Sequence, residues 1–203
     1  MSHMIYEDYR KSALKHLKTC EYMIDNLNTI AEDDKLDGLT KSEWKDHILR
    51  NIYYLCGYVI EGIVNYCIYK KLRFSNTANI KTFEEHNLRS FSSSFLLDTG
   101  VCFNRFQQGR KGIYYYSIHD HNFAKNMDVL KRIIPNIRTV DIVNNPKDMT
   151  NKSSILYYDW TVERRYQTDN THFCPTIINI NEEEILNFFI FVREEIYIKM
   201  SIL

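Results

Sequence analysis

The chain has 203 residues, 44% of them hydrophobic, and its 26 basic residues balance its 26 acidic residues. This length allows one domain with a sizeable core, and zero net charge argues against a strong nonspecific nucleic-acid binder. Only 6 glycines and 3 prolines occur, which favours long helices over a loop-rich or all-β fold.

The first predicted helix runs from about Tyr6 to Ala31. Its apolar residues recur at steps of three and four, which is the pattern of a surface helix with one buried side. The residues of this stripe are Ala13, Leu17, Cys20, Ile24, Leu27 and Ala31. A polar break follows from Asp33 to Gly38.

The second predicted helix begins after Thr40 and runs to about Arg73. Thr40 and Glu43 have the spacing of a capping box, in which each side chain satisfies a free backbone N–H group. Between Ile48 and Leu72 the helix is apolar on nearly all sides, so we expect other elements to surround it.

The most hydrophobic part of this helix, Tyr53–Tyr69, raises the question of a membrane span. It is shorter than the roughly 20 apolar residues that a span needs, and Glu61 and Asn65 interrupt it. We therefore predict a buried core helix and no association with a membrane.

The middle of the chain is less regular, and we assign residues from about 90 to 120 to an insertion. Further helices are predicted over residues 122–134 and 155–167 from their apolar spacing. The last helix begins after Asn181, a favourable N-cap that acidic residues follow. Five apolar residues are expected to bury this helix: Ile185, Phe188, Phe189, Val192 and Ile196. Together the elements predict an all-α, up-and-down helical bundle that forms a single domain over residues 1–203.

The five cysteines form no C-x-x-C pair, and several lie in apolar helical stretches where free cysteine acts as a small hydrophobic residue. Such a set is typical of a reducing compartment. The N-terminus lacks a basic-then-apolar signal pattern, and residues 1–4 resemble a cloning remnant. We therefore expect a cytoplasmic protein.

The segment Tyr53–Glu61 reads YYLCGYVIE. It resembles the second helix of HEPN domains (the higher eukaryotes and prokaryotes nucleotide-binding family), a hydrophobic run that contains Gly-Tyr and a Glu shortly after. The first helix, with Ala13, His16 and Leu17, is similar to the opening of the family. The resemblance covers most of the chain and implies a HEPN-like bundle that forms a homodimer.

In the family, a His followed by a polar residue and Leu or Phe begins the next helix. Two sites fit this pattern, His86 with Leu88 and His121 with Phe123. The spacing from Glu61 favours His86, whereas the distance to the later motif favours His121. Both remain candidates.

The later segment Trp160–Tyr166 is similar to the Arg-Tyr signature of the family. Many HEPN proteins are metal-independent endoribonucleases whose active site carries an Arg followed, four to six residues later, by a His. Six residues separate Arg165 from His172. The resemblance implies that these two residues are the catalytic candidates. Tyr166 occupies the position where that motif usually has Asn or Asp.

In an active enzyme, His172 would exchange a proton with a ribose 2′-hydroxyl or with the leaving oxygen. Arg165 would hold the scissile phosphate, and Glu61 would fix the guanidinium. The alternative is that Glu61, Arg164 or Arg165, and Tyr166 form a buried polar cluster without chemistry, because a carboxylate in an apolar helix needs a partner in any case.

A further cluster, His119-Asp120-His121, has a spacing that can supply metal ligands, but no second motif completes a site. We predict no metal and no cofactor. The leading hypothesis is an RNA- or nucleotide-directed HEPN protein, such as an endoribonuclease of a toxin or phage-defence system. The alternatives are a non-catalytic HEPN module that binds nucleotide or a partner protein (an antitoxin or a nucleotidyltransferase-like protein), and a purely structural helical protein.

Overall fold

The computed structural model describes residues 4–30, 40–71, 76–77, 126–127, 130–131, 134, 152–162 and 181–203. These residues are mostly helical and include no strand, which agrees with the all-α prediction. The named elements are α1 (Tyr6–Asp25), α2 (Leu27–Ile30), α3 (Lys41–Lys71), α8 (Lys152–Tyr158), α9 (Glu182–Phe191), the π-helix η2 (Val192–Ile198) and α10 (Lys199–Ser201).

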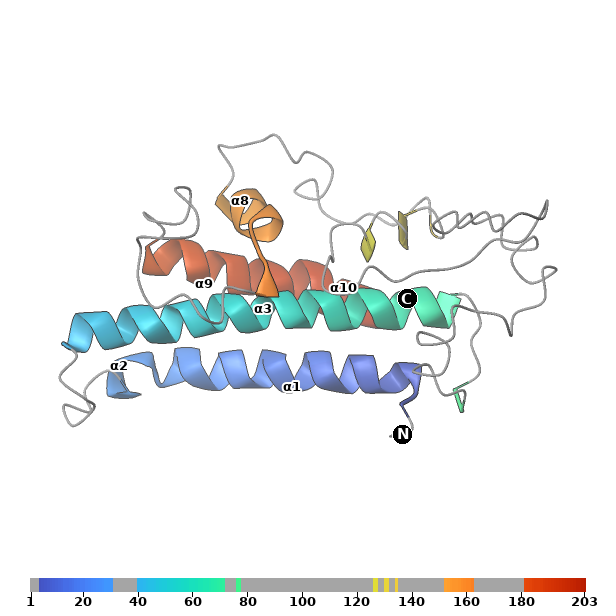
Figure 1. The fold of residues 1–203 in the computed structure, drawn as a ribbon, viewed down its shortest axis with the longest axis horizontal. Helices are drawn as coiled ribbons and strands as arrows, with labels where there is room; N and C mark the ends of the chain where they lie inside the picture. The colour runs from blue at the N-terminus through green and yellow to red at the C-terminus, as the bar shows by residue number, and fades with distance from the viewer. Residues whose placement is uncertain are drawn as a thin grey trace.

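Helix α3 is the centre of the molecule (Figure 1). Helix α1 runs antiparallel to α3 along most of its length, and the continuous α9–η2–α10 helix packs on another side of α3. Helix α8 lies against α9. The central position of α3 follows from its sequence, because a helix that is apolar on nearly all sides must be covered from several directions.

The first helix ends earlier than its periodicity predicts. Asn26 interrupts it, and a separate short helix, α2, follows. The Asn26 side chain donates a hydrogen bond to the carbonyl oxygen of Tyr22 at 2.8 Å, a local bond that competes with helix continuation. The predicted stripe is confirmed at Ala13, Leu17 and Cys20, which are buried against α3.

The capping box before α3 is confirmed. The Thr40 hydroxyl oxygen accepts a hydrogen bond from the Glu43 backbone N–H at 3.2 Å, and the Glu43 carboxylate accepts one from the Thr40 backbone N–H at 2.8 Å. These bonds satisfy two of the N–H groups that the first turn leaves without helical partners. The start of α3 therefore follows from local chemistry.

The prediction that other elements surround α3 is also confirmed. Its buried residues point in every direction around the axis: Ile48, Leu49, Ile52, Tyr53, Cys56, Gly57, Val59, Ile60, Gly62, Ile63, Val64, Asn65, Tyr66, Cys67, Ile68 and Tyr69. Gly62 lets α1 approach closely, since a Cβ there would lie 2.8 Å from the Tyr9 carbonyl oxygen. None of the helices in the described parts combines the length and hydropathy needed to cross a membrane.

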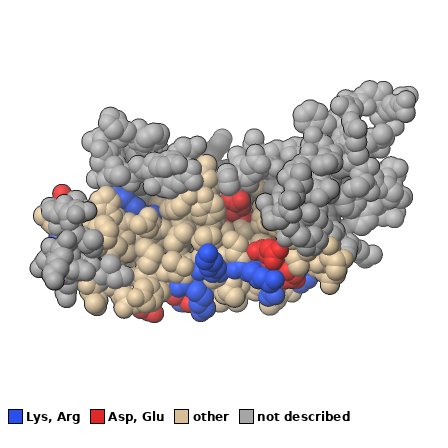
Figure 2. Space-filling view, turned by 60° about the horizontal axis from the view of Figure 1, so that its bottom comes forward, with Lys and Arg blue, Asp and Glu red and all other residues tan. Residues whose placement is uncertain are grey.

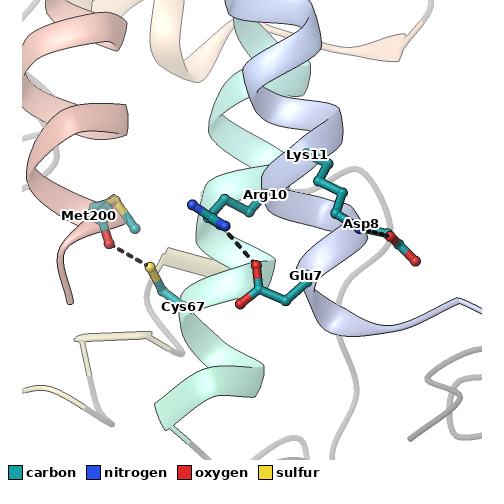
Figure 3. A network of polar contacts seen from close by, with 6 residues as sticks. All are labelled: Glu7, Asp8, Arg10, Lys11, Cys67 and Met200. Atoms are coloured by element: carbon teal, nitrogen blue, oxygen red, sulfur yellow. Dashed lines mark hydrogen bonds and ion pairs between the residues drawn. The ribbon is translucent and has the colours of Figure 1, made fainter. Parts of the chain in front are cut away.

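The last helix begins where predicted. Asn181 accepts a hydrogen bond from the Glu184 backbone N–H at 3.0 Å, and the Glu184 carboxylate accepts one from the Asn181 backbone N–H at 3.0 Å. All five residues expected to bury the helix are buried: Ile185, Phe188, Phe189, Val192 and Ile196. The π-helical stretch was not expected from the sequence. Figure 3 shows how the end of this helix is held, with the Cys67 thiol of α3 donating to the Met200 carbonyl oxygen at 3.2 Å.

The helix predicted over residues 155–167 is wrong in its boundaries. Helix α8 spans Lys152–Tyr158, and the chain leaves helical conformation at Asp159 and Trp160. The apolar and aromatic spacing continues past Tyr158, but tertiary packing of Trp160 on α3 overrides it. The helix predicted over residues 122–134 is supported at 126–127 and 130–131, where Met127 and Leu130 join the core. The predicted insertion at about 90–120 lies outside the described residues.

Candidate functional site

Glu61 is the one predicted site residue that the structure describes. It lies half-buried on α3. The other candidates lie outside the described residues: His86, His121, Arg164, Arg165, Tyr166 and His172. The pairing of Arg165 with His172, and that of Arg165 with Glu61, therefore remain predictions.

Glu61 shares a face of α3 with the Gly-Tyr pair of the resemblance. Tyr54, Gly57, Tyr58 and Glu61 follow the i, i+3, i+4, i+7 spacing that places side chains on one side of a helix. This face, which we call the Glu61 face, lies next to the chain segment that leaves α8 and contains Trp160.

Two tyrosines of this face pack with a histidine of α1 and with Trp160, and we call these four side chains the aromatic cluster: His16, Tyr54, Tyr58 and Trp160. The ring centroids of Tyr54 and Tyr58 lie 5.0 Å apart, and those of Tyr58 and Trp160 lie 5.4 Å apart, both in edge-on arrangements. The two tyrosine hydroxyl groups are 2.6 Å apart. Edge-on ring pairs of this kind add stability beyond the area that they bury.

Gly57 is required at the centre of this contact. A Cβ at position 57 would lie 1.9 Å from the indole carbon Cε2 of Trp160, a distance that no real Cβ contact shows. The indole N–H of Trp160 donates to the Tyr54 carbonyl oxygen at 3.0 Å, which fixes the orientation of the ring on the helix. The two segments that carry the HEPN resemblance, around residues 57 and 160, therefore meet at one point.

His16 reaches the aromatic cluster from α1. Its imidazole stacks on the Tyr58 ring with the centroids 5.4 Å apart. Burial lowers the pKa of His16, and the positive charge of Lys15 lowers it further. The neutral imidazole is therefore favoured in the folded protein. The sequence pattern identified His16 as part of the first helix and gave no indication that it contacts Tyr58.

Asn65 lies one turn beyond Glu61 on α3 and is only 1% exposed. Its side-chain oxygen Oδ1 has no hydrogen-bond partner among the residues that the structure describes. Leaving such a group unsatisfied costs about 1–3 kcal/mol. The Glu61 carboxylate and the Asn65 amide oxygen lie four residues apart on α3. Both can accept hydrogen bonds from a guanidinium or from another group with several N–H donors.

The described residues were also searched for metal ligands and reactive thiols. No group of three His, Cys, Asp or Glu side chains within them could hold a metal ion. Burial raises the pKa of the Cys67 thiol to about 12 and also raises the pKa of the Cys56 thiol, so neither is a ready nucleophile.

The described surface of α1 carries charges of both signs. The charged side chains in Figure 2 include both signs lying next to one another, in keeping with the ion pairs that α1 forms between residues three apart. Arg10 pairs with Glu7 at 2.9 Å, and Lys11 pairs with Asp8 at 3.3 Å (Figure 3). Any contact of this face with a phosphate backbone would have to compete with these pairs.

No protein-family model, curated protein or solved structure matches this chain.

Proposed function

We propose that the chain is a HEPN-like protein that cleaves RNA without a metal, with Arg165 and His172 as its catalytic pair. Glu61 is the positioning residue that holds the Arg165 guanidinium. The observation that carries this proposal is the contact between Gly57 and Trp160, because it joins the two segments on which the resemblance depends.

The covalent chain supports the pairing of Glu61 with Arg165. Glu61 is one helical turn, about 6 Å, from Gly57. Arg165 follows Trp160 by five residues, which span at most about 18 Å when fully extended. A long arginine side chain at that tether length can reach the Glu61 face.

The chemistry of the Glu61 face supports the same pairing. A half-buried carboxylate is most favourable next to a cation, and a guanidinium has five N–H groups to donate. The Glu61 carboxylate can accept hydrogen bonds from the N–H groups on one edge of the guanidinium. The unsatisfied Oδ1 of Asn65, one turn away, is a second acceptor on the same helix edge.

Held in this way, the remaining edge of the Arg165 guanidinium would bind the scissile phosphate in a bidentate manner. His172 would take the proton of the ribose 2′-hydroxyl as that oxygen attacks phosphorus, and would return a proton to the departing 5′-oxygen. The products are a 2′,3′-cyclic phosphate and a free 5′-hydroxyl. Arg165 would offset the negative charge that develops on the phosphate oxygens.

The test is cleavage of labelled RNA in the presence of EDTA. We expect the wild-type protein to cleave, and Arg165→Ala and His172→Ala each to lower the rate by at least about a hundredfold. The matched controls are Arg10→Ala and His47→Ala, which change an arginine of α1 and a histidine near the start of α3, about 21 Å along the helix from Glu61. We expect both controls to retain activity.

Cleavage that Arg165→Ala and His172→Ala leave undiminished would contradict the assignment of this pair. A wild-type protein that binds RNA or nucleotide in the same buffer but never cleaves it would contradict the nuclease proposal. That result would favour the non-catalytic module, in which the same residues form a polar cluster.

A further inference from the structure

The aromatic cluster forms a continuous set of ring contacts between the core and the surface of α1. Trp160 is only 5% exposed, and the Tyr54 ring stacks on it with the centroids 6.0 Å apart and the planes 18° apart. Tyr58 meets both of these rings edge-on. His16 joins the cluster by stacking on Tyr58, and its side chain is half-buried. The cluster therefore includes an imidazole that a ligand in solution can reach.

The imidazole of His16 has one covered face. Tyr58 lies against that face, with the two centroids 5.4 Å apart and the planes 29° apart. Because the side chain is half-buried, its exposed part lies on the side of the ring away from Tyr58. An accessible aromatic face is a surface on which an unpaired nucleobase can stack, and histidine is one of the side chains that stack bases in RNA-binding proteins. A base placed there would extend the existing stack of His16 on Tyr58.

The contacts within the aromatic cluster fix the rings before a ligand binds. The hydroxyl oxygens of Tyr54 and Tyr58 lie 2.6 Å apart. The indole N–H of Trp160 donates to the Tyr54 carbonyl oxygen at 3.0 Å, and the missing Cβ of Gly57 leaves room for the indole. A ring whose supports are already ordered loses little conformational entropy on binding, and such preorganisation favours affinity. Tyr58 is therefore a rigid support for the imidazole.

The charges around His16 on α1 suit a phosphate chain beside a stacked base. Burial and the charge of Lys15 both lower the pKa of His16, so the imidazole is mainly neutral at pH 7, and stacking does not require its charge. Lys15 is exposed. Residues 12–20, one turn on either side of His16, contain Lys15 and Lys18 but no acidic residue. A phosphate next to the stacked base would therefore meet a lysine, and α1 has no carboxylate within one turn of His16.

The stack lies about one helical turn from the residue that positions the proposed catalytic arginine. Tyr58, which supports His16, precedes Glu61 by three residues, about 4.5 Å along the axis of α3. In the proposed function, Glu61 holds the Arg165 guanidinium that binds the scissile phosphate. A base on His16 would therefore belong to a nucleotide close to the scissile bond. Its stacking would hold the strand in place while His172 exchanges a proton with it.

We propose that His16 is the stacking platform for one unpaired base of a single-stranded RNA substrate, and that Lys15 contacts a phosphate adjoining that base. Because the base belongs to the strand that Arg165 and His172 cleave, this assignment rests on the proposed function. A base inside an A-form duplex is covered on both faces by its neighbours and cannot reach the imidazole. The site therefore selects single-stranded over double-stranded RNA.

The test is binding of the full-length protein to a labelled oligouridylate of about 12 nucleotides, a length that single-strand sites cover. Its riboses are 2′-O-methylated, so the strand cannot be cleaved and binding is measured apart from catalysis. We expect His16→Ala to raise the dissociation constant roughly tenfold or more, which is the effect of losing one stacked base. His16→Phe keeps a ring and should bind almost as the wild type does. The matched control is His47→Ala, a half-buried histidine tilted against Trp44, which should leave the dissociation constant unchanged.

Two further measurements test the phosphate contact and the preference for single strands. Lys15→Gln should reduce the slope of the logarithm of the binding constant against that of the salt concentration by about 0.7, the value for one phosphate contact with a single strand. The same oligonucleotide annealed to its complement should bind the wild type more weakly than the single strand does. Circular dichroism checks that each variant remains folded.

The stacking site is overturned if the wild type does not bind the strand, or if it binds the duplex equally well. Equal dissociation constants for the wild type and His16→Ala, or for His16→Phe and a weakened His16→Ala, would also overturn it. An unchanged salt slope in Lys15→Gln would overturn the phosphate contact. If unmodified RNA is still cleaved in these cases, the nuclease proposal stands. Binding that depends on His16, without cleavage of unmodified RNA, would support the stacking site and contradict the nuclease proposal alone.

Discussion

At the scale of single residues, the protonation of His16 makes the stability of the fold depend on pH. Its imidazole is half-buried on Tyr58, and burial together with Lys15 lowers its pKa from the usual 6.5. The unfolded chain therefore binds a proton at a higher pH than the folded protein does. Stability contributed by the neutral imidazole is complete above the unfolded pKa and is lost as the pH falls through that value towards the lower folded pKa.

We accordingly expect the free energy of unfolding to decrease as the pH is lowered from about 7.5 to about 5.5. His16→Gln, which cannot take up a proton, should show a shallower decrease over the same range. Urea unfolding at several pH values, with His47→Gln as the matched control, measures this difference. Equal slopes for the wild type and His16→Gln would contradict the expected protonation effect.

At the scale of elements, the seating of the Trp160 segment on α3 depends on Gly57. A Cβ at position 57 would overlap the indole ring, so either the ring or the helix must move. We expect Gly57→Ala to lower the free energy of unfolding by at least about 2 kcal/mol, even though alanine is the better helix former. Chemical denaturation measures the loss.

Two further variants identify the cause of that loss. Asn51→Ala changes an exposed residue of the same helix, and its effect should stay within about 0.5 kcal/mol. In a Trp160→Ala background the ring is absent, so Gly57→Ala should cost much less than it does in the wild type. An equal cost in both backgrounds would show that the overlap with Trp160 is not the reason that glycine stands at this position.

The starts of α3 and α9 could be predicted from sequence, whereas the boundaries of α8, the end of α1 and the π-helix could not. Thr40 with Glu43, and Asn181 with Glu184, make their bonds within four residues, so the signal is local. The break at Asn26 and the early end of α8 depend on which of two competing sets of contacts is stronger. The π-helical register depends on the fit of the whole last helix to the core, which no short window of sequence contains.

The candidate site likewise has features that the sequence predicts and features that it does not. The sequence shows Glu61 as an interruption of an apolar helix and Gly57 as part of the Gly-Tyr pair, and the burial of this helix was correctly predicted. The reason for Gly57 was not visible, because the ring that requires it is more than a hundred residues away in the chain. The stacking of His16 on Tyr58 is a contact between α1 and α3. The spacing of residues along either helix alone does not predict which side chains of the two helices meet.

At the scale of the whole molecule, the central helix joins distant parts of the chain into one core. Helix α1, the C-terminal helix and the Trp160 segment each contact a different side of α3. The Glu61 face lies on the side where Trp160 packs. Our central claim is that this side also receives Arg165, so that Glu61 and the segment after Trp160 act as a unit.

A double-mutant cycle between Glu61 and Arg165 tests that claim most directly, because it measures the pairing itself and does not require activity. We predict that the effects of Glu61→Gln and Arg165→Gln on the free energy of unfolding are coupled by about 1–3 kcal/mol. The cycle with Arg164→Gln, the adjacent arginine, should show a coupling within about 0.3 kcal/mol. Additive effects of Glu61→Gln and Arg165→Gln would contradict the pairing on which the proposed function rests.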